Sequence, residues 1–109
     1  MKLIIAIVHD DDASHVIGEL NKADYQVTKL ATTGGFLKAG NTTILTGVED
    51  EQVPDVKKII KDVCKTRKAT IAPPTSVVGG GGMYIPSPVE VTIGGATIFV
   101  LNVDEFEKA

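Results

Sequence analysis

The order of apolar and polar residues predicts a strand and then a helix at the start of the chain. Residues 2–8 are nearly all apolar and rich in Ile and Val, which is typical of a central strand buried on both faces. Three aspartates follow at positions 10–12, and we expect one of them to cap a helix. Residues 13–23 are apolar at helical spacing. Gly18 lies among them, and we expect it to allow close approach to the sheet.

Two more strands and a second helix are predicted next. Residues 25–30 and 42–48 have strand patterns, and a Gly-rich segment separates them. Pro54 then suits a first helical turn, and an apolar stripe from position 53 to 63 predicts a helix that ends near Thr66. The other side of this helix carries lysines, which we expect to be simply solvated: Lys57, Lys58, Lys61 and Lys65.

The C-terminal part begins with a long Gly/Pro-rich segment, residues 67–88, in which we predict an irregular loop that is mobile without ligand. Residues 89–93 alternate as a strand, and Gly94-Gly95 is a two-residue hairpin signal that leads to a last strand at 97–103. Asp104 is expected to cap a short terminal helix that carries Phe106.

Together these elements predict one α+β domain over residues 1–109. The order βαββαβ is that of a ferredoxin-like fold, here with an added C-terminal hairpin strand and the long Gly/Pro-rich loop. Because the strands are apolar on both sides and two helices cover only one sheet face, we expect self-association to cover the other.

Composition and charge argue against several classes of function. The chain has 109 residues and a net charge of −3, which argues against a general binder of DNA or RNA. No apolar run approaches the roughly 20 residues needed to span a membrane, and we expect no signal peptide. The single cysteine, Cys64, fits a reducing cytoplasm and lies beside an apolar stripe, where packing is its expected role.

We predict neither a catalytic nor a metal site. His9 and His15 are the only histidines, and neither has a partner at ligand spacing. The pair Asp10-Asp11 suits helix capping better than acid–base chemistry, and the glycines at 79–82 lack the Lys-Ser/Thr ending of a P-loop.

The segment 28–43 carries the chemistry that does stand out. Backbone amides freed by Gly34 and Gly35, together with Thr hydroxyls, suit phosphate oxygens. Phe36 can stack on a base, and Asn41 offers a donor and an acceptor to a base edge. A polar-edged Gly-Gly turn in a hairpin would have the same residues, so the residues alone leave both interpretations open.

This segment resembles the signature of the cyclic di-AMP receptor family of PII-like signal-transduction proteins. Residues 1–8 and 84–100 are similar to the first strand and the C-terminal hairpin of that family, so the resemblance extends from Met1 to about Phe106. It implies a PII-like homotrimer with inward-facing sheets that binds cyclic di-AMP in clefts between subunits, with no other cofactor.

The resemblance also implies the ligand-binding residues. Thr28 would donate to a phosphate, Phe36 would lie against one adenine in a lid, and Asn41 would read the other adenine. The full set is Gln26, Thr28, Gly35, Phe36, Leu37, Asn41, Gly47 and Phe99. The chain departs from the family pattern at Asp24 and Gln26, where Asn and Arg are usual, and Lys108 stands where Gln is frequent. Gln26 cannot supply a guanidinium to phosphate, so we expect weaker binding or a different ligand.

Three functions follow as hypotheses. The first is a non-enzymatic cytoplasmic sensor, in which ligand orders residues 35–37 and the 67–88 loop and so changes the surface offered to a protein target. The second is a trimeric protein–protein adaptor with weak or lost nucleotide binding. The third, a small enzyme such as an acylphosphatase, lacks a convincing Arg–Asn pair, because Arg67 is the only arginine.

Overall fold

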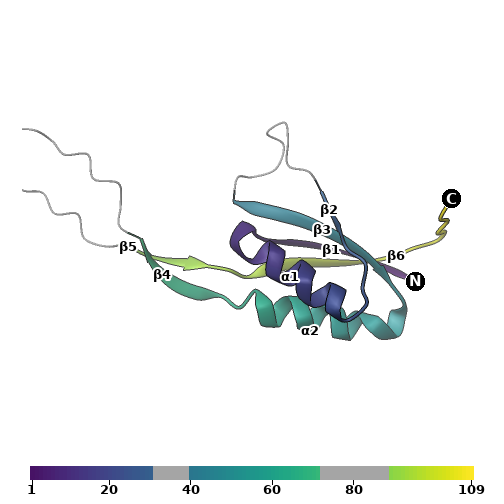
Figure 1. The fold of residues 1–109 in the computed structure, drawn as a ribbon, viewed down its shortest axis with the longest axis horizontal. Coiled ribbons are helices and arrows are strands. Elements are labelled where there is room, and N and C mark those ends of the chain that lie inside the picture. The colour runs from purple at the N-terminus through teal and green to yellow at the C-terminus, as the bar shows by residue number, and fades with distance from the viewer. Residues whose placement is uncertain (31–39, 72–88) are drawn as a thin grey trace, which may run out of the picture.

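The computed structural model describes residues 1–30, 40–71 and 89–109. Two helices and six strands are found there, together with one 3-10 turn, η1 (Figure 1). In chain order they are β1 (Lys2–His9), α1 (Asp10–Lys22), β2 (Thr28–Lys29), β3 (Asn41–Val48), η1 (Asp50–Gln52), α2 (Val53–Val63), β4 (Arg67–Ile71), β5 (Val89–Ile93) and β6 (Ala96–Asn102).

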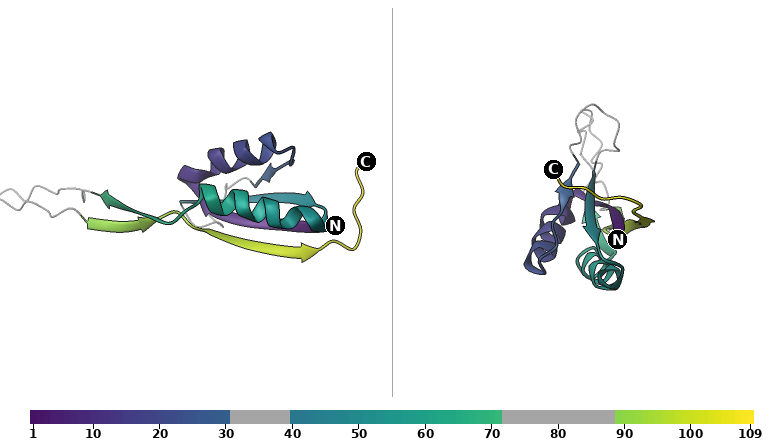
Figure 2. Two further views of the ribbon diagram at one scale, coloured as in Figure 1. Left: turned by 90° about the horizontal axis from the view of Figure 1, so that it is seen from below. Right: turned by 90° about the vertical axis from the view of Figure 1, so that its right-hand side faces the viewer.

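Four strands form one antiparallel sheet in the order β2-β3-β1-β6, and β4 and β5 pair in a second, two-stranded sheet. The predicted central position of the first strand is confirmed, since β1 pairs on both sides. The β4–β5 pair extends away from the two helices as an arm (Figure 2). This arrangement is a small α+β structure compatible with a ferredoxin-like fold.

The hydrophobic core lies between the four-stranded sheet and the two helices. Even-numbered residues of β1 point into it, and Ile4, Ala6 and Val8 are at most 1% exposed. Val16 and Leu20 of α1 and Val56 and Ile60 of α2 meet them from the other side. The predicted apolar faces of both helices are therefore the faces that they bury.

The opposite sheet face, which we call the open face, carries the odd-numbered residues of β1 and β3 and their partners on β6. Leu3 and Ile5 are only partly buried there, while Phe99 is 51% and Leu101 44% exposed. No described helix covers this face. The prediction that the helices leave one apolar sheet face uncovered is confirmed for the single chain.

Three local predictions about helices are wrong. His9 rather than an aspartate is the N-cap of α1, because its Nδ1 accepts from the backbone N–H of Asp11 at 3.2 Å and the aspartates fill the first turn instead. Gly18 is exposed and has no close neighbour, so no close approach to the sheet depends on it. No helix forms around Phe106.

Two predictions near the arm also fail. Residues 67–71 form strand β4 rather than irregular chain, and β4 pairs with β5. Gly94-Gly95 is therefore not a hairpin turn between β5 and β6 but a joint at which the chain leaves one sheet and enters the other; both glycines have positive φ, +90° and +86°. The rest of the predicted mobile loop, residues 72–88, lies outside the described residues.

Candidate functional site

One end of the open face is hollowed. The hollow has a volume of about 410 Å³ and lies where β3 ends and β1 begins. Its lining consists of Met1, Leu3, Gln26, Thr28, Leu45, Thr46, Gly47, Val103 and Phe106. Three residues expected to bind ligand, Gln26, Thr28 and Gly47, therefore meet around a single concave surface.

The register of the sheet explains this meeting. Thr28 on β2 lies opposite Leu45, and Gly47 lies opposite Leu3 on β1, so Thr28 and Gly47 share the open face. The side chain of Thr28 is exposed, which leaves its hydroxyl available as a donor or acceptor at the hollow.

Two hydrogen bonds from side chains help to hold the segment before β2 in place. Thr46 Oγ1 donates to the backbone carbonyl of Gln26 at 2.7 Å, and the hydroxyl of Tyr25 donates to Asp55 of α2 at 2.7 Å. The bond to Asp55 raises the pKa of Tyr25 above its ordinary value, because it stabilises the protonated phenol. Asp24 has a left-handed backbone, with φ +67°, at the turn into this segment.

Gly47 leaves space that the fold itself does not use. A Cβ built on Gly47 would meet no atom within 4 Å, and its φ is not positive. Within the described part of the chain, neither packing nor backbone conformation therefore requires glycine here. A glycine inside a strand often marks a place where a ligand or another backbone approaches closely.

Phe106 was missed as a site residue. It is 66% exposed at the rim of the hollow instead of lying in a helix. Its sequence context carries the signal that could have found it: acidic residues at 104, 105 and 107 surround a single aromatic and leave no apolar stripe with which a helix could pack.

Two other expected residues lie elsewhere on the open face. Asn41 stands at the opposite end of β3, beside a smaller hollow of about 190 Å³ that His9 and Thr97 also line. Phe99 lies between the two ends, opposite Ile5. Gly35, Phe36 and Leu37 lie outside the described residues.

Charge around the main hollow is unusual for a phosphate site. Among the described residues that line it, none is Lys or Arg. Gln26 occupies the position where the resemblance leads one to expect arginine, and its side-chain amide is neutral.

The remaining chemistry is sparse in the described ranges. No group of three His, Cys, Asp or Glu side chains there could hold a metal ion. Cys64 is 2% exposed and packs in the core, as expected, and burial raises the pKa of its thiol to about 11. Neither described helix is long and apolar enough to cross a bilayer.

Fold and hollow together define a small α+β protein with a ligand-sized concavity on an uncovered apolar sheet face. Over residues 1–109 the chain matches the family model of the cyclic-di-AMP receptor, and it belongs to that family. It is also similar to a crystal structure of a functionally unknown protein from Pediococcus pentosaceus ATCC 25745, with 42% sequence identity and a TM-score of 0.74. That match covers 99% of this chain and 96% of the other.

Proposed function

We propose that this protein is a non-enzymatic cytoplasmic sensor that binds cyclic di-AMP at the subunit interfaces of a homotrimer and signals to a protein target. Membership of the cyclic-di-AMP receptor family supports the ligand class. The observation that supports this position for the ligand is the hollow on the open face, where Gln26, Thr28 and Gly47 meet.

The open face supports assembly. Phe99 and Leu101 are about half exposed in the single chain, and Leu3 and Ile5 are incompletely buried beside them. Covering this surface with other copies would gain roughly 25 cal/mol per Å² of apolar area removed from water. The helices cover the opposite face, so trimer formation through the open face leaves the core packing unchanged.

The positions of Asn41 and Gly47 support a site shared between copies. They are six residues apart on one extended strand, a separation of roughly 20 Å at about 3.4 Å per residue. A single chain therefore presents them at opposite ends of β3. A subunit interface can bring Asn41 or Phe99 of one copy to the hollow of the next, which completes the proposed ligand set.

Within the hollow each residue has a chemical role. Thr28 donates its hydroxyl to a phosphate oxygen, and Gly47 leaves room for the ligand against the strand backbone. Phe106 offers an exposed aromatic ring on which an adenine can stack, a contact worth about 1–3 kcal/mol. Gly35, Phe36 and Leu37 complete the proposed site as a lid.

A specific observation favours a second candidate function, a trimeric adaptor with weak or lost nucleotide binding. The described lining of the hollow contains no Lys or Arg, while Asp24 adds a negative charge to the segment that leads into the hollow. Both features disfavour a dianionic ligand.

Calorimetric titration separates the two functions. The sensor predicts saturable binding of cyclic di-AMP that is tighter than binding of ATP or cyclic di-GMP, with one ligand per chain. Light scattering on the same sample should give the mass of three chains. A stable trimer that releases no heat with millimolar cyclic di-AMP would favour the adaptor, and a stable monomer at the concentrations used would exclude both.

A further inference from the structure

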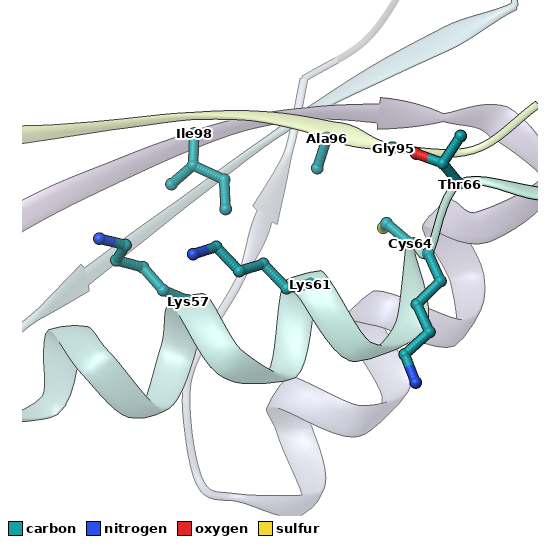
Figure 3. Close-up of a pocket in the computed structure, with 8 residues that line it drawn as sticks. Lys57, Lys61, Cys64, Thr66, Gly95, Ala96 and Ile98 are labelled. Atoms are coloured by element: carbon teal, nitrogen blue, oxygen red, sulfur yellow. The ribbon is translucent and has the colours of Figure 1, made fainter.

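Lysines of α2 and of the residues just after it form a basic surface next to the edge of the sheet. Four lysines, Lys57, Lys58, Lys61 and Lys65, lie along this helix and just beyond its end. Between α2 and β6 lies a hollow of about 430 Å³, which Lys57, Lys61 and Lys65 line together with Ile98. Figure 3 shows the side chains of Lys57 and Lys61 extending from α2 toward β6, below Ile98. We call this surface the lysine groove.

No ion pair within the described part of the chain neutralises the lysine groove, although Asp62 lies beside Lys57, Lys58 and Lys61 along a neighbouring hollow. The ammonium groups of its four lysines form no ion pair or hydrogen bond with the described residues, whereas Lys22 on α1 pairs with Glu19 at 3.2 Å. The whole chain has a net charge of −3, so this cluster of like charges is a local exception. Clustered, uncompensated cations create a potential that attracts anionic groups.

The strand beside the groove is open to pairing. β6 lies at the edge of the four-stranded sheet and pairs on one side with β1, while no strand within residues 1–30, 40–71 and 89–109 pairs with its other side. An unpaired edge presents N–H and C=O groups that can accept another extended chain. Val100 and Leu101 are 41% and 44% exposed on the two faces of this strand.

The lysine groove and the free edge of β6 together favour one residue pattern in a bound segment. Ile98 points to the helix side, where Lys57 and Lys61 lie, whereas Phe99 points to the open face. A segment added beside β6 would alternate in the same way, because successive side chains of a strand point to opposite faces. Carboxylates on one face would meet the lysines, and apolar side chains on the other would extend the open face.

We propose that the lysine groove and the free edge of β6 form the docking site for an acidic, extended segment of a target protein, which adds to the sheet as a further strand. The proposal goes beyond nucleotide binding and does not depend on it. α2 covers the face opposite to the open face, so the proposed trimer keeps the lysines at its outer surface.

A labelled peptide tests the proposal. The probe is an eight-residue peptide of alternating Glu and Val with an N-terminal fluorophore, and its binding to the full chain is followed by fluorescence anisotropy. Lys61→Glu should weaken binding by about fivefold, and the effect should shrink at high salt. Lys22→Glu changes the net charge equally but lies on α1, and it should leave binding unchanged. Replacing the two central residues of the peptide, one Glu and one Val, by Pro should abolish binding, since successive N–H groups of a strand point to opposite sides and one of the two removed donors must face β6.

Each other result overturns the proposal. No binding at millimolar peptide, with both variants showing the circular dichroism of the wild type, excludes the site. Equal losses with Lys61→Glu and Lys22→Glu would show a response to net charge alone. Undiminished binding of the Pro peptide would exclude strand addition. If polyphosphate or a short RNA binds with the same Lys61 dependence while the peptide does not, the groove is a polyanion surface.

Discussion

Arg67 Nη2 lies 2.8 Å from Oδ1 of Asp12, and this ion pair fixes the base of the β4–β5 arm to the first turn of α1. Asp12 is only 6% exposed, so its carboxylate needs the partner. The bond to Asp12 raises the pKa of Arg67 above its ordinary value. Arg67 Nη1 also donates to the carbonyl of Lys65 at 3.2 Å, which connects the end of α2 to the same joint.

Arg67→Ala should lower the melting temperature, because it leaves the buried carboxylate of Asp12 without its cation. Arg67→Lys should give an intermediate value, since lysine keeps the charge but cannot reproduce both contacts of the guanidinium, of which the second joins Nη1 to Oδ2 of Asp12 at 3.4 Å. Thermal denaturation followed by circular dichroism measures both. The exposed Lys29→Ala serves as a control for loss of one positive charge, and a melting temperature equal to that control would contradict the role of the pair.

Two glycines should respond to alanine in opposite directions. A Cβ on Gly94 would lie 2.6 Å from the carbonyl oxygen of Lys65, and its φ is +90°, so Gly94→Ala should destabilise by about 1–2 kcal/mol or more. Gly18 is exposed in α1 with no atom near its Cβ position, so Gly18→Ala should stabilise by about 1 kcal/mol. Urea denaturation measures both free energies of unfolding, and the same sign for both would refute the assignment.

Local pattern predicted most of the body of the fold and failed where pairing is non-local. The apolar run of β1 and the helical spacing of apolar residues in α2 are local patterns that reflect which side chains are buried. Both elements therefore begin and end within a few residues of their predicted bounds. Gly94-Gly95 has the same residue pattern in a hairpin and in a joint between sheets. Only the distant partner of β5, which is β4, decides between them.

The candidate site could likewise be predicted only in part from the sequence. Thr28 and Gly47 came together because the register of β2, β3 and β1 places them near one end of the sheet. Asn41 lies at the opposite end of the same strand, and sequence similarity alone does not reveal this separation. Phe106 reached the hollow because residues 103–109 form no helix, although a capping residue had suggested one.

Cys64 should be unreactive in the folded protein. Its thiol is 2% exposed, and its pKa of about 11 leaves almost no thiolate at pH 8. Ellman's reagent should therefore react slowly until denaturant is added. The ordinary pKa of a cysteine thiol is 9.0, so between pH 9 and 11 the folded state binds more protons than the unfolded state. The free energy of unfolding should therefore fall as pH rises through that range. Cys64→Ala should lose less stability over the same interval, and an equal loss would exclude this thiol as a contributor.

Gly47→Val should separate folding from binding. The chain has room for the side chain, and valine favours strands, so the melting temperature should not fall. The added atoms would fill the hollow, and affinity for cyclic di-AMP should fall roughly tenfold or more, since overfilling a packed site costs about 1–3 kcal/mol. Calorimetry with Gly47→Ala as the smaller step should give an intermediate loss. Undiminished affinity in the valine variant would place the ligand elsewhere.

Gln26→Arg should strengthen nucleotide binding without altering the fold. Thr46 bonds to the backbone carbonyl of Gln26, not to its side chain, so this substitution leaves the hydrogen bond that positions the segment intact. The hollow has no Lys or Arg in its described lining, and a guanidinium there would form a charge-assisted bond to phosphate worth about 1.5–3 kcal/mol. The gain should shrink at high salt, because the hollow is open to solvent. Gln26→Met, which has similar length and no charge, controls for the loss of the amide and should show no gain. If Gln26→Arg binds cyclic di-AMP no better than Gln26→Met, phosphate does not lie at this position and the proposed site is wrong.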